Sequence, residues 1–137
     1  MSAIGTEPDA FTFEDCRNRL REATQIVLGK ERDFEAAVKN AADAEAFYRS
    51  QLAVKFAEYR AAGKGVEEST TLARADVSVH SRERDYRAGV LKLAAERLED
   101  ARDSRRSLWR LVEWARERDL IAARAQVGQQ QSLGVTG

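Results

Sequence analysis

A helical spacing of apolar residues runs along almost the whole chain, and one sharp turn signal, Gly63-Lys64-Gly65, interrupts it. Apolar residues recur at steps of three and four on both sides of this signal, which is the period of an amphipathic α-helix. Proline, which breaks helix interiors, occurs once in 137 residues. The sequence therefore predicts an all-α chain: a long helical hairpin with coiled-coil-like packing plus a short N-terminal helix.

Capping residues and glycines indicate where the helices begin and end. Thr12, followed three residues later by Asp15, is typical of a helix start. Gly29 is a plausible break between two helices. We expect helices over about residues 13–28, 32–62 and 67–126, with a hinge at residues 63–66, inside one helical domain that spans residues 12–126.

We also predict the order of the two ends of the chain and the continuity of the third helix. We predict that residues 1–11 form a flexible acidic arm and that residues 127–137 form a disordered tail. An unbroken third helix would be roughly 90 Å long at about 1.5 Å per residue. We therefore expect it to bend or break, with Gly89 as a weak point, or to pair with another chain.

Composition excludes several classes of protein. Charged residues make up 34% of the chain, and the formal net charge is zero, unlike the strongly basic balance of a dedicated DNA-binding domain. Cys16 is the single cysteine and His80 the single histidine, so we expect no disulfide, no metal site and no cofactor. We predict no enzyme activity and no small-molecule substrate, because no nucleophile has a base beside it. No apolar run reaches the ~20 residues of a membrane span and no secretory signal is present, so we expect a cytoplasmic protein.

The Gly-Lys-Gly signal does not match a nucleotide-binding loop. The Walker pattern needs G-x-x-x-x-G-K-[ST] after a buried strand, whereas Lys64 follows a helical segment and precedes Gly65. We interpret the signal as a reversal between two helices, with Gly63 as a left-handed cap.

Cations and aromatic rings alternate along the helix that leads into the hinge. Such a pattern is typical of surfaces that bind single-stranded nucleic acid, because cations contact the phosphates and rings stack on the bases. It equally fits a hairpin core covered by a solvated basic face, and both interpretations stay open. The candidate nucleic-acid-binding residues are Arg49, Lys55, Tyr59, Arg60 and Lys64.

The far part of the third helix carries a second candidate surface. Apolar residues alternate there by three and four, which is the heptad spacing of a coiled coil. Arg105 interrupts the stripe and is expected to pair with an acid of a partner helix. Trp109 and Trp114 are five positions apart, so we expect one in the core and the other between subunits. The candidate oligomerisation residues are Leu98, Ala101, Arg105, Leu108, Trp109, Val112 and Trp114.

The order of these features is similar to that of a known family. A helix with tyrosines leads through a basic segment into "GKG", and "TTLARADVSV", Tyr86 and leucines at coiled-coil steps follow. Over about residues 40–115 the chain resembles the UvsY recombination mediators of tailed phages, small all-helical proteins of similar length. The resemblance implies a ring-like homo-oligomer that binds single-stranded DNA and helps to load a recombinase onto strands covered by single-strand-binding protein.

The resemblance also points to a residue. The family's DNA contact lies on a lysine-bearing helix just before its Gly-x-Gly turn, and the matching position is Lys55. This chain departs from the family in being neutral, with few lysines. Phosphate binding scales with the cations supplied, so we expect weak binding by one chain and recovery through several copies.

Two other classes of protein remain as alternatives. A structural or adaptor coiled coil that binds only protein partners explains the neutral charge and the long apolar stripe without DNA. The secreted helical hairpins of actinobacteria carry a Trp-x-Gly turn, which "AAGKG" lacks.

Overall fold

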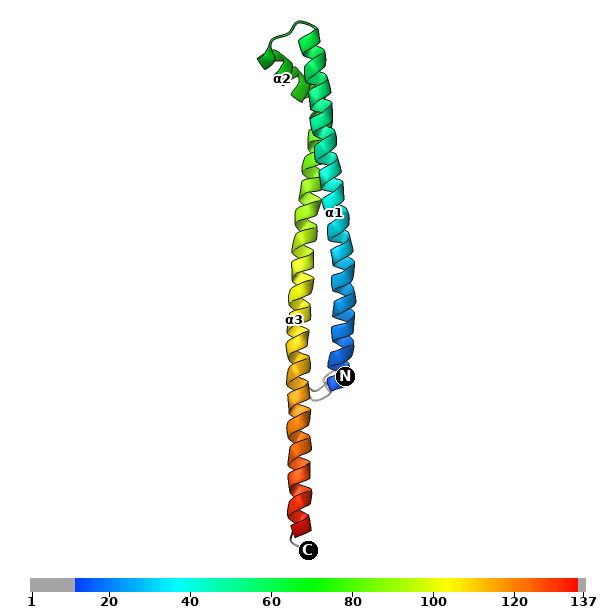
Figure 1. Cartoon of the computed structure of the whole chain (residues 1–137), viewed down its shortest axis with the longest axis vertical. Helices are drawn as coiled ribbons and strands as arrows, with labels where there is room; N and C mark the ends of the chain where they lie inside the picture. Colours follow the sequence, from blue (N-terminus) through cyan, green and yellow to red (C-terminus); the bar gives the residue numbers. More distant parts are fainter. Residues whose placement is uncertain (1–11, 136–137) are drawn as a thin grey trace, which may run out of the picture. The chain divides into compact units, whose positions relative to one another are not determined.

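The protein is all-α, as the sequence predicts. A computed structural model describes residues 12–135, and within that range it contains three helices and no strand: α1 (Phe13–Ala61), α2 (Val66–Asp76) and α3 (Ser78–Val135) (Figure 1). The predicted acidic arm at residues 1–11 lies outside the described residues.

The helices form two compact units. One unit combines the start of α1, up to Leu28, with the end of α3, from Asp100. The other spans Gly29–Glu99 and holds the rest of α1, all of α2 and the start of α3. We call them the terminal unit and the hinge unit.

The terminal unit is held together by small and medium-sized apolar side chains. Cys16 of α1 packs with Val112 and Ala115 of α3, and Phe13 and Leu20 cover this cluster. Cys16 is a free cysteine and is buried as a small core residue. The predicted helix start is also confirmed. The Thr12 hydroxyl accepts a hydrogen bond from the Asp15 amide, and the Asp15 carboxylate accepts one from the Thr12 amide, a reciprocal cap.

In the hinge unit α1 and α3 run antiparallel, and polar and aromatic side chains join them. Arg84 of α3 lies 4.2 Å from the ring centre of Tyr48, and its Nε is 3.6 Å from the Glu45 carboxylate. His80 of α3 meets Phe47 edge to face, with ring centres 4.8 Å apart. A cation over an aromatic face and an edge-to-face ring pair are both favourable contacts. These contacts fix the register of α1 against α3 near the hinge.

The reversal after α1 is closed by backbone hydrogen bonds. The Gly63 amide donates to the Arg60 carbonyl, and the Lys64 amide donates to the Tyr59 carbonyl. This pair of bonds is a Schellman motif, which needs a left-handed residue directly after the helix. Gly63 has φ 89°, the one positive φ among the described residues. The predicted role of Gly63 as a left-handed cap is confirmed.

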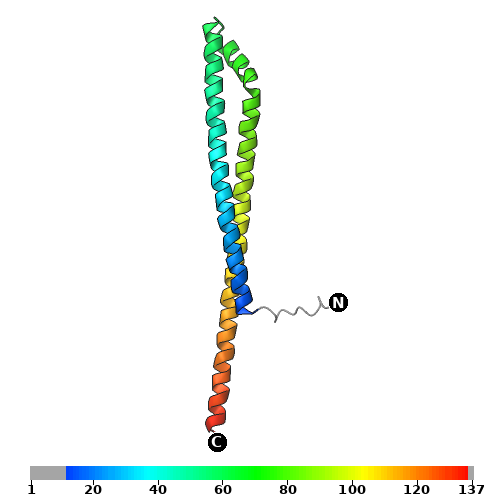
Figure 2. The same cartoon turned by 90° about the vertical axis from the view of Figure 1, so that its right-hand side faces the viewer.

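The helix boundaries differ from those expected at three places. α1 continues through Gly29, and α3 continues through Gly89 and Gly128 to Val135, so helix covers most of the predicted disordered tail. The break lies at Val77 instead, where α2 ends and the chain bends into α3 (Figure 2). A glycine inside a helix costs only ~1 kcal/mol, too little to end a long helix. At Val77 the bend (φ −100°, ψ 16°) comes with full burial of the side chain.

The turn geometry predicts opposite responses at its two glycines. Gly63→Ala should lower the free energy of unfolding by about 1–2 kcal/mol, because a Cβ is unfavourable at positive φ. Gly65→Ala should change it by roughly 0.5 kcal/mol or less, because Gly65 is extended (φ −67°, ψ 168°) with open space around it. Denaturant unfolding followed by far-UV circular dichroism measures both. Equal losses in the two variants would contradict the assigned cap.

Candidate nucleic-acid interface

Three of the predicted nucleic-acid-binding cations lie within reach of a nearby acid on the surface of the hinge unit. Arg49 contacts Glu45 at 2.7 Å, Lys55 contacts Glu58 at 3.4 Å, and Lys64 contacts Glu68 at 3.5 Å. Ion pairs between exposed side chains contribute only about 0–1 kcal/mol each. The pairs therefore lower the local charge, but a phosphate can replace each acid at small cost.

Arg60 and Tyr59, also predicted to bind nucleic acid, make structural contacts. The Arg60 guanidinium donates to the Lys64 carbonyl at 3.0 Å and so helps to close the turn. The Tyr59 hydroxyl donates to the Asp76 carboxylate at 2.5 Å, which ties the last turn of α1 to the last turn of α2. This hydrogen bond, together with desolvation and the nearby negative charge of Asp76, raises the pKa of Tyr59 above its ordinary value of 10.0.

A groove between α1 and α2 gives this end of the hinge unit its shape. It has a volume of about 350 Å³. Leu52, Phe56 and Ala73 give it an apolar lining, and the exposed residues Arg49 and Arg74 stand at its sides. We call this the hinge groove. Its full lining is Arg49, Leu52, Ala53, Phe56, Thr70, Ala73 and Arg74.

The hinge groove brings together some predicted residues and separates others. Arg49 and Arg60 are eleven residues apart, about three helical turns, so they share one face of α1. Lys55 lies roughly a third of a turn away from that face and does not line the groove. Sequence reasoning missed Arg74, because α2 was expected to be the start of one long helix. A break at Val77 would have placed Arg74 opposite the basic end of α1.

Five of the seven predicted oligomerisation residues are buried or half-buried within their own chain. Leu98 and Val112 are buried, and Ala101, Arg105 and Leu108 are half-buried. Leu98 and Val112 are thus already covered within the single chain, and their place between subunits stays a prediction. Val112 packs with Cys16 of α1, so part of the heptad stripe has a partner within the chain.

Neither tryptophan lies in the core of the chain, where one of the two was expected. Trp109 is 54% exposed and Trp114 is 58% exposed, so neither fills the core. Trp109 lines a cleft of the terminal unit beside Phe13 and Leu20. Trp114 carries the Arg118 guanidinium over its ring at 5.1 Å from the ring centre.

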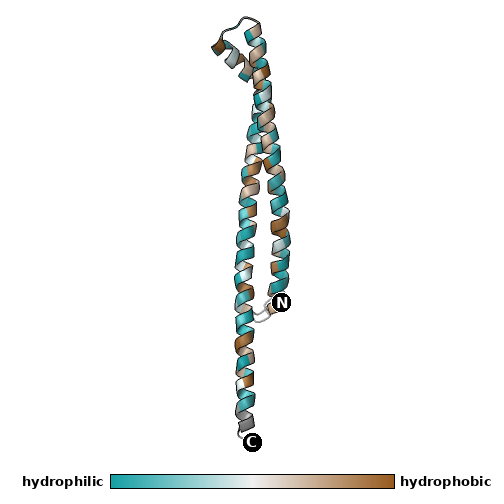
Figure 3. Ribbon diagram, viewed as in Figure 1, coloured by the Kyte–Doolittle hydropathy of each residue, from teal (hydrophilic) through white to brown (hydrophobic). Residues whose placement is uncertain are grey.

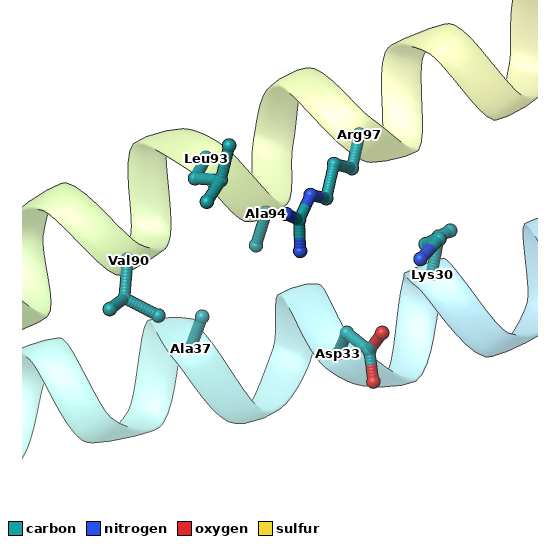
Figure 4. A pocket seen from close by; sticks show the side chains of 7 residues that line it. All are labelled: Lys30, Asp33, Ala37, Val90, Leu93, Ala94 and Arg97. Carbon is teal, nitrogen blue, oxygen red and sulfur yellow. The ribbon is translucent and has the colours of Figure 1, made fainter.

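A second, smaller cleft of the hinge unit lies between α1 and α3. Ala37 and Val90 face each other across it, and the Arg97 side chain reaches toward α1, whereas the Asp33 carboxylate points away (Figure 4). Lys30, Leu93 and Ala94 complete its lining. This lining therefore combines two cations, one carboxylate and aliphatic groups.

The comparisons with known proteins place the chain in no family. No protein-family model, curated protein or solved structure matches the chain. Among residues 12–135, no group of three or more His, Cys, Asp or Glu side chains is placed to hold a metal ion. Within the same range, no helix is long and apolar enough to cross a bilayer.

The bond between Tyr59 and Asp76 predicts a dependence of stability on pH. Folding raises the pKa of Tyr59, so its stabilising effect is complete below the ordinary tyrosine pKa of about 10 and is lost as pH rises through the raised value. Tyr59→Phe should lower the melting temperature at neutral pH and flatten its fall above about pH 10. Thermal unfolding over this range measures the effect.

Tyr86→Phe is the matched control, because Tyr86 is an exposed tyrosine of α3. This variant should have nearly the same melting temperature at neutral pH as the unchanged protein, and nearly the same fall of the melting temperature above about pH 10. If Tyr59→Phe behaves in the same way as this control, the hydrogen bond to Asp76 does not hold α2 against α1.

Proposed function

We propose that this protein is a non-enzymatic, homo-oligomeric single-stranded-DNA-binding protein that acts as a recombination mediator of the phage type. In this role it helps to load a recombinase onto strands covered by single-strand-binding protein, in the cytoplasm of a bacterial host cell. It needs no metal ion, cofactor or small-molecule substrate for this task. The similarity to the UvsY mediators described above supports the class of function, and the hinge groove supports the mode of binding.

The hinge groove is the observation that carries the proposal. Its apolar lining includes the ring of Phe56, and the exposed guanidiniums of Arg49 and Arg74 flank it. Single-stranded nucleic acid exposes both apolar base faces and phosphates, so it is complementary to a groove with an apolar floor and cationic sides. Duplex DNA keeps its bases stacked inside and offers no such face. The chemistry of the groove therefore favours a single strand.

Further cations lie close to the groove along the chain. Arg60 shares the face of Arg49, and Lys64 is in the turn that joins α1 to α2. Local acids reduce their effect, and the whole chain has no net charge. Binding by one copy is therefore weak and sensitive to salt, and useful affinity requires several grooves on one strand. A homo-oligomer supplies them.

Replacement of the groove arginines tests the proposal. Arg49→Gln with Arg74→Gln should weaken binding of a fluorescent oligothymidine at low salt and lower the slope of log K against log salt by roughly 1.4, the share of two phosphate contacts. Fluorescence anisotropy at several salt concentrations measures both quantities. Lys39→Gln with Lys92→Gln removes two exposed cations of the same unit that do not line the groove, and it should change the slope much less.

A second pair of variants separates stacking from charge. Phe56→Ala should weaken binding by the loss of a base-stacking platform, which is worth about 1–3 kcal/mol per base. Phe56→Leu removes the ring but keeps an apolar side chain, so it should bind as weakly as Phe56→Ala while retaining more stability. Full-strength binding by the groove arginine variant and by both Phe56 variants would exclude the groove as the DNA site.

The alternative is an adaptor coiled coil that binds only protein partners. The pairing of Arg49, Lys55 and Lys64 with neighbouring acids favours it, because paired charges are typical of a solvated face. The same anisotropy measurement decides between the two. No binding of a single strand at low salt, by a protein that is folded and oligomeric, would favour the adaptor.

A further inference from the structure

The last part of α3 has no covering in the described part of the chain. Among the residues of α3 whose burial is described, up to residue 131, Ala115 is the last buried one, and between residues 116 and 131 all side chains are exposed except the half-buried Arg118. The helix nevertheless continues to Val135. A single helix of this length is only marginally stable in water unless a packed face supports it. The segment therefore has the features of a helix that lacks a partner.

A largely apolar stripe starts just before this segment and continues into it, on a different face of α3 from the buried residues Val112 and Ala115. Leu111, Trp114, Arg118, Ile121 and Ala125 follow one another at steps of four and three. Leu111 is 50% exposed and Ile121 is 65% exposed, although Val112 and Ala115, about 100° around the helix from Leu111 and Trp114, are buried. Hydrophobic residues recur along this part of α3 (Figure 3). We call this set of five residues the outer stripe.

We propose that the outer stripe pairs antiparallel with the outer stripe of a second copy of this chain. In one register Trp114 faces Ala125 of the partner subunit and Arg118 faces Ile121 of the partner subunit, so a large side chain meets a small one at the tryptophan layer. The Arg118 guanidinium lies over the Trp114 ring within its own chain. The aliphatic part of the Arg118 side chain can then cover the contact between the two outer stripes while its guanidinium reaches water.

The charges beside the outer stripe indicate this orientation. In the same register Glu117 lies opposite Arg124 of the partner subunit, and the twofold symmetry repeats the pair. Neither Glu117 nor Arg124 has an ion pair within the range that the structure describes. A parallel pair would place Arg118 against Arg118 of the partner subunit and would leave Glu117 opposite an alanine. Charge complementarity therefore favours the antiparallel pair of identical helices over a parallel one.

The pairing does not depend on nucleic-acid binding. The pairing uses the outer stripe and not the residues buried within the chain. Each dimer formed in this way contains two hinge grooves. Failure of DNA binding would leave this inference intact, and failure of the dimer would leave the groove to be tested by itself.

Solution mass of the full chain tests the interface. Sedimentation equilibrium over a wide range of protein concentrations should give species of at least twice the chain mass of 15.3 kDa. Trp114→Glu with Ile121→Glu should abolish the association through this stripe. Leu120→Glu is the matched control, since Leu120 is 49% exposed next to Ile121 but on another face of the helix, and it should associate as the unchanged protein does.

Charge reversal tests the orientation. Glu117→Arg alone, or Arg124→Glu alone, should weaken the dimer roughly ten- to thirtyfold, because two attractive pairs become repulsive in each case. The double variant Glu117→Arg with Arg124→Glu should restore it. Circular dichroism checks that every variant keeps its helix content. A monomeric unchanged protein, association that survives Trp114→Glu with Ile121→Glu, or a double variant weaker than both single ones would overturn the proposal.

Discussion

Close packing of helices through small side chains is the constraint on which the rest of this structure depends. The buried residues of α1 are small, Cys16, Ala23, Val27 and Ala37, and Ala115 meets Cys16 from α3. Small residues let helices approach closely, but each removes little apolar surface from water. Larger apolar side chains remain at the edges or outside, and the exposed Trp114 is an example. The same packing that forms the units thus leaves apolar surface for a partner.

The candidate DNA site exists because the chain reverses in two steps. The Schellman cap at Gly63 ends α1, and the bend at Val77 separates α2 from α3. The short helix between them lies beside α1, where the bond from Tyr59 to Asp76 holds it. A direct turn into one long helix would have no groove and would leave Phe56 without Arg74 beside it. The hinge groove therefore depends on the backbone geometry at Gly63 and Val77.

Charge in this protein is organised locally. Several of the ion pairs join residues three or four positions apart on one helix, such as Arg49 with Glu45. Such pairs keep the surface hydrated without giving the chain an overall sign. They make any binding to phosphates dependent on the number of copies that act together. Self-association and DNA binding are thus linked physically in the proposed function, although each rests on a different surface.

The all-α class, the cap at Thr12 and the left-handed turn at Gly63 follow from the sequence alone, because helix period, capping side chains and positive φ are local properties. The sequence could not identify the helix that packs on the heptad stripe. Heptad spacing predicts that Leu98 and Val112 are covered, but a helix of the same chain or of another chain can cover them. The bend at Val77, the hinge groove with Arg74 and the exposure of Trp114 were decided by tertiary packing. The break at Val77 comes with burial of its side chain, whereas α1 and α3 continue through Gly29 and Gly89 because one glycine costs a helix only ~1 kcal/mol.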